Sequence, residues 1–352
     1  MNIADIDPNF KVETQIKKEG LRFIDVRLEP FKIYGIYYEG EKFRRLPEEV
    51  AERTSPGVHK LHANTAGGRV RFMTDSPYIA INASMDGLGK MSHFAFTGSI
   101  GFDLYADGAF VKSFVPSTNI VDGYEGLVEL GEKKMRDITI NFPLYSNVKR
   151  LFVGVDECAT LTRAPGYINE LPVVYYGSSI TQGGCASRPG MSYQSIVSRK
   201  FNLDYINLGF SGNARGEDAI IDYIASLEMS MFVFDYDHNA PSPDHLRRTH
   251  EIAFKKIRAT HPDIPIILMS RPKQRLTEQE KERVEIIRAT YLNAKASGDD
   301  NVYMITGAEL MALSGDEGTV DSTHPTDYGF ASMAKSLCEL IEANKLHLKL
   351  KS

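Results

Sequence analysis

The spacing of hydrophobic residues changes once along the chain, near residue 165. Before that point apolar and polar residues alternate with a period of two, as in residues 69–72 (Arg-Val-Arg-Phe) and 137–142 (Asp-Ile-Thr-Ile-Asn-Phe). Turn-forming residues separate these short runs, for example at residues 75–77 (Asp-Ser-Pro) and 106–108 (Ala-Asp-Gly). Short alternating strands between turns predict an antiparallel, jelly-roll-like β-sandwich over residues 1–165.

After residue 171 the alternation is replaced by continuous apolar runs separated by stretches with helical spacing. The runs lie at residues 173–176, 205–208, 231–234, 264–269 and 302–305. Continuous apolar runs suit parallel strands that are covered on both faces. Strand–helix alternation therefore predicts a doubly wound α/β/α domain with a five-stranded parallel sheet over residues 171–352. Thr277 and Glu280 form a capping-box pattern at the start of one of its helices.

Composition narrows the class of protein. The 352 residues suffice for two domains, and 42% hydrophobic with 25% charged residues is typical of a globular protein. A net charge of −5 without a basic cluster argues against a nucleic-acid partner. No apolar stretch approaches the roughly 18–20 residues of a membrane span. Residues 1–20 are polar and mixed in charge, so we expect a cytoplasmic protein, or a periplasmic or secreted one if a signal was removed.

The three cysteines, Cys158, Cys185 and Cys338, are odd in number and scattered. This pattern fits neither a disulfide framework nor a Cys-x-x-Cys metal site. We therefore expect a chain that does not depend on disulfides.

Ser179 is the leading candidate for a nucleophile. The strand at residues 173–176 ends at Gly177, and two serines follow it, ahead of a predicted helix from Met191. A serine at the carboxyl end of a buried strand lies where open α/β sheets bind ligands. The alternatives are that Ser179 caps the following helix, or that Cys185 is the nucleophile. Cys185, however, lacks a helix-start position and a histidine nearby in sequence.

The base that a serine nucleophile needs is supplied by His324. Asp321 precedes it by three residues, close enough to orient the imidazole, and Pro325 stiffens the segment. Of the nine histidines, only His324 has an acid at this spacing and follows the last predicted strand. Because the carboxyl ends of parallel strands share one edge of the sheet, we expect Ser179 and His324 to meet.

Four short blocks, in this order, resemble those of the SGNH, or GDSL-type, hydrolases. Residues 177–180 (Gly-Ser-Ser-Ile) resemble the first block, and residues 321–324 (Asp-Ser-Thr-His) are similar to the last. Residues 207–213 and 234–239 resemble the second and third. The resemblance implies a flavodoxin-like sheet, a Ser179–His324–Asp321 triad and no metal or other cofactor. It also implies an oxyanion hole made by the backbone N–H groups of Ser179 and Gly209 and the side-chain amide of Asn239.

Two positions depart from the family pattern. Ser178 replaces the acid that usually precedes the nucleophile, and Asp237 replaces the glycine of the third block. Asp237 either weakens the oxyanion hole beside Asn239 or turns away and anchors the loop. Asn239 has an alternative role as a turn residue before Pro241. Asp235 and Asp237 are spaced like metal ligands, but no histidine clusters with them in sequence.

A second resemblance covers the first half of the chain. Residues 101–105 (Gly-Phe-Asp-Leu-Tyr) match the GxDLY signature of a β-rich domain that precedes one branch of these hydrolases, and residues 184–193 are similar to a loop of that branch. The two resemblances together reach from about residue 60 to the C-terminus. We expect the signature itself to be a turn and strand of the sandwich rather than a binding site.

The expected activity is two-step acyl transfer from a small-molecule ester, with acetyl groups on saccharides as the expected substrate class. Arg188, His238 and Arg271 are candidates for substrate contacts, with surface or structural roles as the alternative. Two other functions remain open: a lipase or thioesterase acting on longer acyl chains, and a non-catalytic binding protein that retains the fold. The absence of tryptophan weakens the idea that the sandwich binds sugars by aromatic stacking.

Overall fold

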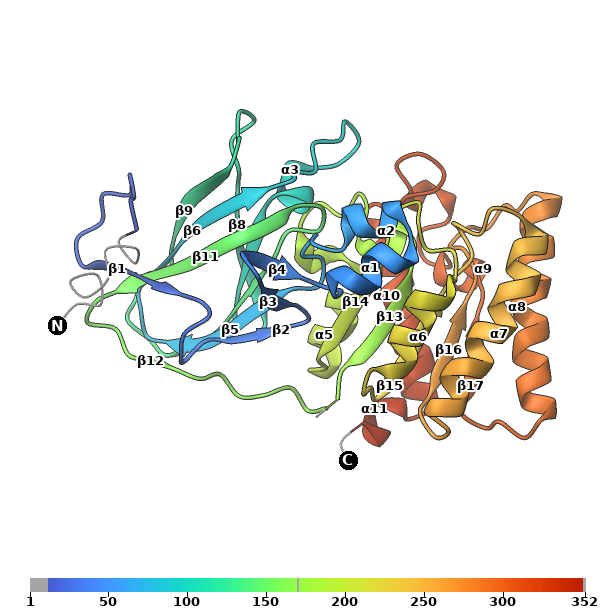
Figure 1. The fold of residues 1–352 in the computed structure, drawn as a ribbon. Coiled ribbons are helices and arrows are strands. Elements are labelled where there is room, and N and C mark those ends of the chain that lie inside the picture. The colour runs from blue at the N-terminus through green and yellow to red at the C-terminus, as the bar shows by residue number, and fades with distance from the viewer. Residues whose placement is uncertain (1–11, 170, 351–352) are drawn as a thin grey trace.

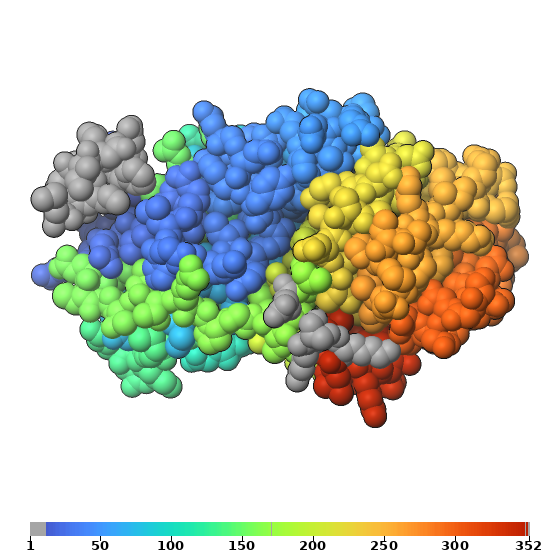
Figure 2. Space-filling model, turned by 60° about the horizontal axis from the view of Figure 1, so that its bottom comes forward, coloured from blue at the N-terminus to red at the C-terminus, as the bar shows by residue number. Residues whose placement is uncertain are grey.

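The computed structural model describes residues 12–169 and 171–350, and it consists of an antiparallel β-sandwich followed by a parallel α/β sheet (Figure 1). In Figure 2 the blue and green atoms of the first half lie beside the yellow to red atoms of the second. Both predicted architectures are therefore confirmed. Among the described residues, none of the helices has the length and apolar character that crossing a membrane requires.

The sandwich has a four-stranded and a six-stranded sheet, both antiparallel. The smaller sheet has the order β1 (Leu21–Asp25), β11 (Asn147–Asp156), β6 (Tyr78–Asp86), β9 (Gly123–Glu129). The larger has the order β12 (Leu161–Thr162), β5 (Arg69–Thr74), β10 (Arg136–Asn141), β7 (Phe102–Ala106), β8 (Ala109–Phe114), with β2 (Lys32–Tyr34) also paired to β5. The remaining elements of this half are β3 (Tyr37–Glu39), β4 (Lys42–Arg44), α1 (Glu48–Thr54), α2 (Pro56–Leu61) and α3 (Phe96–Ser99).

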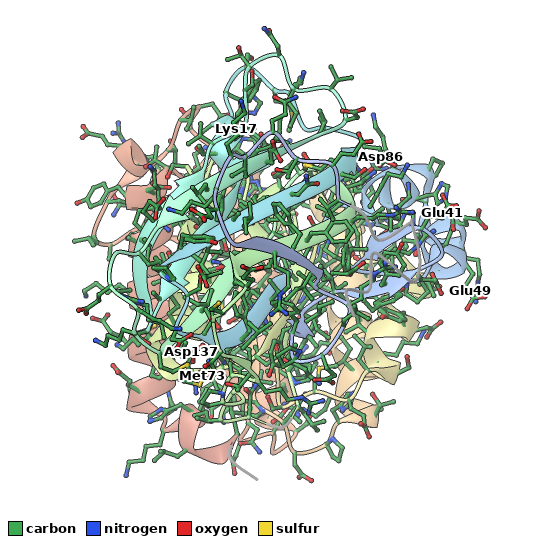
Figure 3. The ribbon with its side chains drawn as sticks, turned by 90° about the vertical axis from the view of Figure 1, so that its left-hand side faces the viewer. Lys17, Glu41, Glu49, Met73, Asp86 and Asp137 are labelled. Carbon is green, nitrogen blue, oxygen red and sulfur yellow. The ribbon has the colours of Figure 1, made fainter. Side chains whose placement is uncertain are left out.

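The period-two pattern corresponds to the two faces of β5 and β10. Phe72 lies opposite Ile138 and Val70 opposite Ile140, and all four side chains are fully buried in the sandwich core. The intervening residues, such as Met73 and its partner Asp137, lie on the opposite face of the sheet, and Figure 3 labels these two side by side. The alternating runs were therefore correctly interpreted as strands with one face in the core.

The second half is a five-stranded parallel sheet with the strand order of a flavodoxin-like fold. The order is β14 (Tyr205–Gly209), β13 (Val173–Gly177), β15 (Met231–Asp235), β16 (Ile266–Met269), β17 (Val302–Ile305). The helical segments are α4 (Ser179–Gln182), η3 (Pro189–Met191), α5 (Tyr193–Phe201), α6 (Asp218–Ser226), α7 (Pro243–Thr260), α8 (Glu278–Ala296), α9 (Gly307–Leu310), η4 (Asp316–Gly318), α10 (Asp327–Ala343) and α11 (Leu346–Lys349).

Helices cover both faces of this sheet. Val173 and Tyr175 of β13 share a core with α5 and α10, whereas Val174 and Tyr176 share the opposite core with α6, α7 and α8. Both faces of the strand are thus buried, which explains its continuous apolar sequence. The capping box at the start of α8 is confirmed, because the Thr277 hydroxyl accepts from the Glu280 N–H and the Glu280 carboxylate accepts from the Thr277 N–H.

The two halves share part of their packing. Ala51 of α1 and Val58 of α2 belong to the same core as Val174 of β13. Arg45, which is also N-terminal to the sheet, is fully buried and donates to the carbonyl oxygens of Asn207 and Gly209 at 3.0 and 2.8 Å. Burial lowers the pKa of this guanidinium to about 9. The first half therefore fixes the carboxyl end of β14 directly.

Candidate active site

Ser179 is held at the tip of β13 by a sharp strand-to-helix turn. It is the first residue of α4, and the Ser178 hydroxyl caps this helix by accepting from the Ile180 N–H at 3.2 Å. Gly177 is required just before the turn, since a Cβ there would lie 2.1 Å from Thr181 Oγ1 and 2.5 Å from the Asp235 carbonyl oxygen. The helix-capping role therefore falls to Ser178, which leaves the Ser179 hydroxyl free for another partner.

His324 lies in a tight loop between η4 and α10. An antiparallel bridge between Thr319 and Pro325 closes the loop, and the Val320 N–H donates to the His324 carbonyl oxygen at 2.8 Å. Inside the loop Asp321 accepts twice from the same residue: Oδ1 from the His324 backbone N–H at 2.8 Å and Oδ2 from Nδ1 at 2.8 Å. The Asp-x-x-His spacing thus fixes both the backbone and the ring of the histidine.

Hydrogen bonds join the three side chains in one line. Ser179 Oγ lies 2.9 Å from His324 Nε2, on the opposite side of the ring from Asp321. Burial acts to raise the pKa of Asp321, but the N–H groups of His324 outweigh it and the pKa is lowered. Because an ionised carboxylate only accepts, Nδ1 carries the ring proton and Nε2 is free to accept from the Ser179 hydroxyl.

The structure does not support Gly209 as an oxyanion donor. Its N–H already donates to Asn207 Oδ1 at 2.9 Å, and a Cβ at Gly209 would lie 2.2 Å from the Gln182 nitrogen. Gly209 is the last residue of β14 and is a glycine because α4 packs against it. Gly212 lies in the turn beyond, at φ +71° and with open space beside its α-carbon.

Asn239 lies next to this turn, with its Oδ1 accepting from the Ala214 N–H at 3.3 Å. Within residues 171–350, its Nδ2 group has no hydrogen-bond partner and is available as a donor. The Asn239 amide thus ties the third block to the turn of the second while keeping one donor free.

Asp237 turns away from Asn239 and anchors the loop. Its fully buried carboxylate receives Arg271 Nε and Nη2 at 3.0 and 2.9 Å, and the Arg271 backbone N–H at 3.0 Å. Burial acts to raise the pKa of Asp237, but Arg271 outweighs it, so the pKa is lowered. Arg271 also contacts Glu280 at 2.8 Å. These contacts are made inside the protein and favour the structural role of Arg271 over a contact with substrate.

Arg188 is also occupied elsewhere. Its Nη1 lies 3.1 Å from Asp103 Oδ2 and contacts the Tyr105 hydroxyl, and its guanidinium lies 3.7 Å from the centre of the Phe110 ring. Asp103 is fully buried and accepts in addition from the Gly190 N–H at 2.8 Å. Arg188 is thus a contact between the two halves, and the aspartate of the GxDLY signature is the residue that receives it.

His238 is near the proposed base but does not share a proton with it. Burial and the charge of Arg271 lower the pKa of His238 to about 4, and His324 contributes to the same shift. The His238 Nε2 atom is buried without a hydrogen-bond partner in the described structure. The ring is therefore neutral near pH 7 and is held beside Asn239.

Asp235 and Asp237 do not converge on a shared ligand position. Asp235 Oδ2 accepts from Thr181 Oγ1 at 2.7 Å and contacts Tyr193, and burial raises the pKa of this carboxyl to about 7.

Three aromatic residues of the first half, unmarked by any sequence motif, also reach the site. The Tyr145 hydroxyl donates to the Ser179 carbonyl oxygen at 3.1 Å. The rings of His93 and Phe94 lie 5.6 and 6.3 Å from the His324 ring. These residues lie in loops of the sandwich, where no periodic pattern could place them beside a serine of the other half.

Fold and site geometry define a flavodoxin-like parallel α/β domain with an appended sandwich, and comparison with known families agrees. Residues 170–342 match the GDSL-like lipase/acylhydrolase family, and residues 21–161 match GxDLY, the N-terminal region of SGNH-hydrolase-type esterases. The second half of the chain is thus a GDSL-like lipase/acylhydrolase domain, and the first half is the GxDLY domain found at the N-terminus of SGNH-hydrolase-type esterases.

Solved structures support the same two-domain fold. A Bacteroides ovatus protein described as a putative GDSL-like lipase is 29% identical, with a TM-score of 0.83 over 94% of this chain and 98% of that one. The salicylyl-acyltransferase SsfX3 of a tetracycline biosynthetic pathway is 19% identical, with a TM-score of 0.77 over 94% and 99%. A family two carbohydrate esterase from Clostridium thermocellum, solved with cellohexaose, is 15% identical, with a TM-score of 0.64 over 90% and 99%. No curated protein gave a match.

Proposed function

We propose that the protein is a serine esterase that cleaves small acyl esters through an acyl-enzyme. The observation that carries the proposal is the unbroken hydrogen-bonded line from Ser179 through His324 to Asp321, with both joining distances below 3 Å. A hydroxyl, an imidazole and a carboxylate in this order form the arrangement by which serine is activated at neutral pH.

In the proposed reaction Ser179 Oγ attacks the ester carbonyl while His324 Nε2 takes the hydroxyl proton. Asp321 stabilises the resulting imidazolium, which then protonates the leaving alcohol. Water, deprotonated by the same imidazole, hydrolyses the acyl-enzyme and regenerates Ser179.

We assign the oxyanion hole to the N–H groups of Ser179 and Gly212 and to Asn239 Nδ2. Gly212 replaces the expected Gly209 because its neighbour Ser211 hydrogen-bonds Tyr145, the same side chain that donates to the Ser179 carbonyl oxygen. The second-block turn is thereby held next to the nucleophile. Asn239 then supplies the third donor from the adjoining loop.

We further propose that the substrates are acetyl esters of saccharides. A groove that begins at Tyr145 and Ser211 is lined by the polar side chains of Lys60, Asn64, Lys90, Asn147 and Asn213. Asn64 and Asn147 hydrogen-bond each other, and Lys90 donates to the Ile120 carbonyl oxygen, so Lys60 is the charged group of the groove that we assign to sugar hydroxyls. Aromatic rings at His93 and Phe94 flank His324, which favours a short acyl group over a long one. The fold is shared with an acetyl xylan esterase from Butyrivibrio proteoclasticus at 13% identity and with the cellohexaose-bound esterase, so the scaffold supports this chemistry elsewhere.

The non-catalytic alternative rested on Asp237 lying beside the oxyanion donor. Since Arg271 holds that carboxylate away from Asn239, this reason no longer favours a binding protein.

A p-nitrophenyl ester series tests the proposal. Acetate should be hydrolysed faster than butyrate, and butyrate faster than octanoate. Ser179→Ala should reduce kcat by about 10⁶. Ser178→Ala is the matched control, because it removes a helix cap worth about 1 kcal/mol and leaves the nucleophile in place. Hydrolysis that persists in Ser179→Ala would refute the assigned nucleophile, and a preference for octanoate would favour the lipase or thioesterase alternative.

The saccharide assignment needs a separate comparison. Acetate release from acetylated xylo-oligosaccharides should proceed with a higher kcat/KM than release from p-nitrophenyl acetate. Lys60→Ala, in the groove, should lower only the former. Equal loss on both substrates, or none on either, would argue against the groove as a sugar site.

A further inference from the structure

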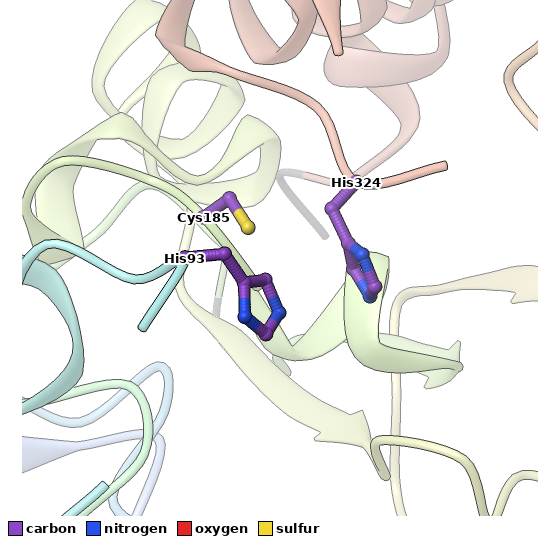
Figure 4. A group of neighbouring side chains, drawn as sticks. All are labelled: His93, Cys185 and His324. Carbon is purple, nitrogen blue, oxygen red and sulfur yellow. The ribbon is translucent and has the colours of Figure 1, made fainter. Parts of the chain in front are cut away.

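Three potential metal ligands from separate segments meet beside the nucleophile. His93 comes from the sandwich loop between β6 and α3, Cys185 from the loop after α4, and His324 from the loop before α10 (Figure 4). One ligand atom from each of the three lies within 4.8 Å of the other two. Figure 4 shows the Cys185 sulfur and the two imidazoles directed toward the space between them.

The donor set is that of a thiophilic divalent cation. Zinc binds thiolate sulfur and imidazole nitrogen at about 2.0–2.3 Å, which places tetrahedral donor atoms roughly 3.3–3.7 Å apart. The present spacing needs a movement of about 1 Å. The His93 ring, which is exposed and has no hydrogen bond or ion pair to the described part of the chain, can make this movement by rotation.

His324 is already oriented as a metal-bound histidine would be. Its Nδ1 donates to Asp321 at 2.8 Å, so the lone pair is on Nε2. A carboxylate on the far nitrogen is the usual outer partner of a zinc-bound imidazole, since it fixes the ring and raises its basicity. The same contact that would prepare His324 as a general base therefore also prepares it as a ligand.

Cys185 has no other assigned role. It is a free thiol, 9% exposed, and its backbone is held at φ +71° in a loop whose Gly184 N–H donates to the Ser179 carbonyl oxygen at 2.7 Å. The negative charge of Asp321 acts on this thiol, and a negative charge beside three donor atoms favours a cation between them.

We propose that His93, Cys185 and His324 form an inhibitory binding site for Zn²⁺ or a cation of similar ligand preference. Binding displaces the Cys185 thiol proton to solvent and uses the Nε2 lone pair of His324 that would otherwise accept from Ser179. Water or a substrate oxygen completes the coordination. The consequence for esterase activity rests on the proposed function, whereas binding itself does not.

Co²⁺ provides a readout that is independent of activity. Titrating the full chain with Co²⁺ in thiol-free buffer should produce a sulfur-to-cobalt charge-transfer band in the near ultraviolet, and Zn²⁺ should abolish it. Cys185→Ser should abolish the band, and His93→Gln should weaken Zn²⁺ binding by more than the 10–100-fold typical of an outer partner. Cys158→Ser, at an exposed free thiol of the sandwich, is the matched control and should leave both unchanged.

Ser179→Ala should retain the cobalt band although it is inactive, which separates failure of this site from failure of the proposed esterase. In the active protein, half-inhibition by Zn²⁺ should shift in His93→Gln by the same factor as the dissociation constant, and a chelator should restore activity. A wild-type cobalt spectrum without the sulfur band, or a Zn²⁺ affinity that is equal in wild type and His93→Gln, would overturn the proposal.

Discussion

Replacing Asp103 with asparagine tests whether the sandwich supports the catalytic half through one buried carboxylate. Asp103 is fully buried and accepts from Asn141 Nδ2 at 2.7 Å, the Gly190 N–H at 2.8 Å and Arg188 Nη1 at 3.1 Å. In the asparagine variant, an NH₂ group replaces one carboxylate oxygen, and its hydrogens would point at a group that is itself a hydrogen-bond donor. Removing one partner of a buried pair costs about 3–5 kcal/mol. At about 2–4 °C per kcal/mol, the melting temperature should fall by roughly 6–20 °C.

Activity should fall with stability in this variant. Gly190 and Arg188 belong to the segment that joins the nucleophile helix α4 to α5. A displacement of about 1 Å near a reacting group can reduce kcat by about 10²-fold. We therefore expect Asp103→Asn to lower kcat for p-nitrophenyl acetate well below its melting temperature, with KM less affected.

A double-mutant cycle with Arg188→Gln supplies the control. Burial raises the pKa of Asp103 despite its three donors, which indicates that desolvation offsets much of the pair's attraction. The double variant should then be more stable than the sum of the two single effects by at least about 1 kcal/mol. The reasoning fails if Asp103→Asn melts within about 2 °C of wild type, or if the two substitutions simply add.

Three further predictions concern the site itself. Asn239→Asp keeps the acceptor for the Ala214 N–H but removes the Nδ2 donor. The kcat should therefore fall by about 10²–10³ while the melting temperature is unchanged. A normal kcat would contradict the oxyanion role of Asn239. Because burial raises the pKa of Asp235 from 3.8 to about 7, the folded state holds a proton that the unfolded state releases. The free energy of unfolding should therefore decrease from pH 4 to 7, by up to about 1.4 kcal/mol per unit, and Asp235→Asn should flatten this part of a urea-unfolding profile; identical wild-type and variant profiles would count against the shift. Gly209→Ala should prevent correct folding, seen as loss of near-ultraviolet circular dichroism, since its Cβ would lie 2.2 Å from the Gln182 nitrogen; a stable, fully folded variant would show that α4 can move away.

The features that sequence predicts well are those fixed by periodicity and topology. Continuous apolar runs identified β13 and its neighbours because both faces of a parallel strand are buried. The meeting of Ser179 with His324 followed from the same topology, since each comes after the carboxyl end of a strand. The Asp321 spacing could be interpreted because a three-residue separation lets a carboxylate reach both the backbone and the ring.

Side chains whose role depends on a distant partner were not predictable. Arg188 and Arg271 were candidates for substrate contacts, yet each is paired with a buried aspartate, Asp103 and Asp237 respectively. Long, charged side chains reach several ångströms, so position in sequence does not fix where the guanidinium ends. The expectation that the Gly209 N–H is an oxyanion donor was not supported for a local reason. The sequence does not distinguish the last residue of a strand, whose N–H is used internally, from the residues of the turn that follows.

The change of hydrophobic period near residue 165 marks the boundary between the two halves but does not reveal that the sandwich contributes residues to the proposed active site. Periodicity separates the halves near residue 165, but α1 and α2 pack on the parallel sheet, and Tyr145 donates to the carbonyl oxygen of Ser179 itself. The rings of His93 and Phe94, from a sandwich loop, lie beside the His324 ring. The second half of the chain supplies the hydroxyl, imidazole and carboxylate, whereas the sandwich supplies part of the wall around them. Substitutions in the loop around His93 should therefore change substrate preference. Substitutions near residue 179 that leave the nucleophile intact should change it less.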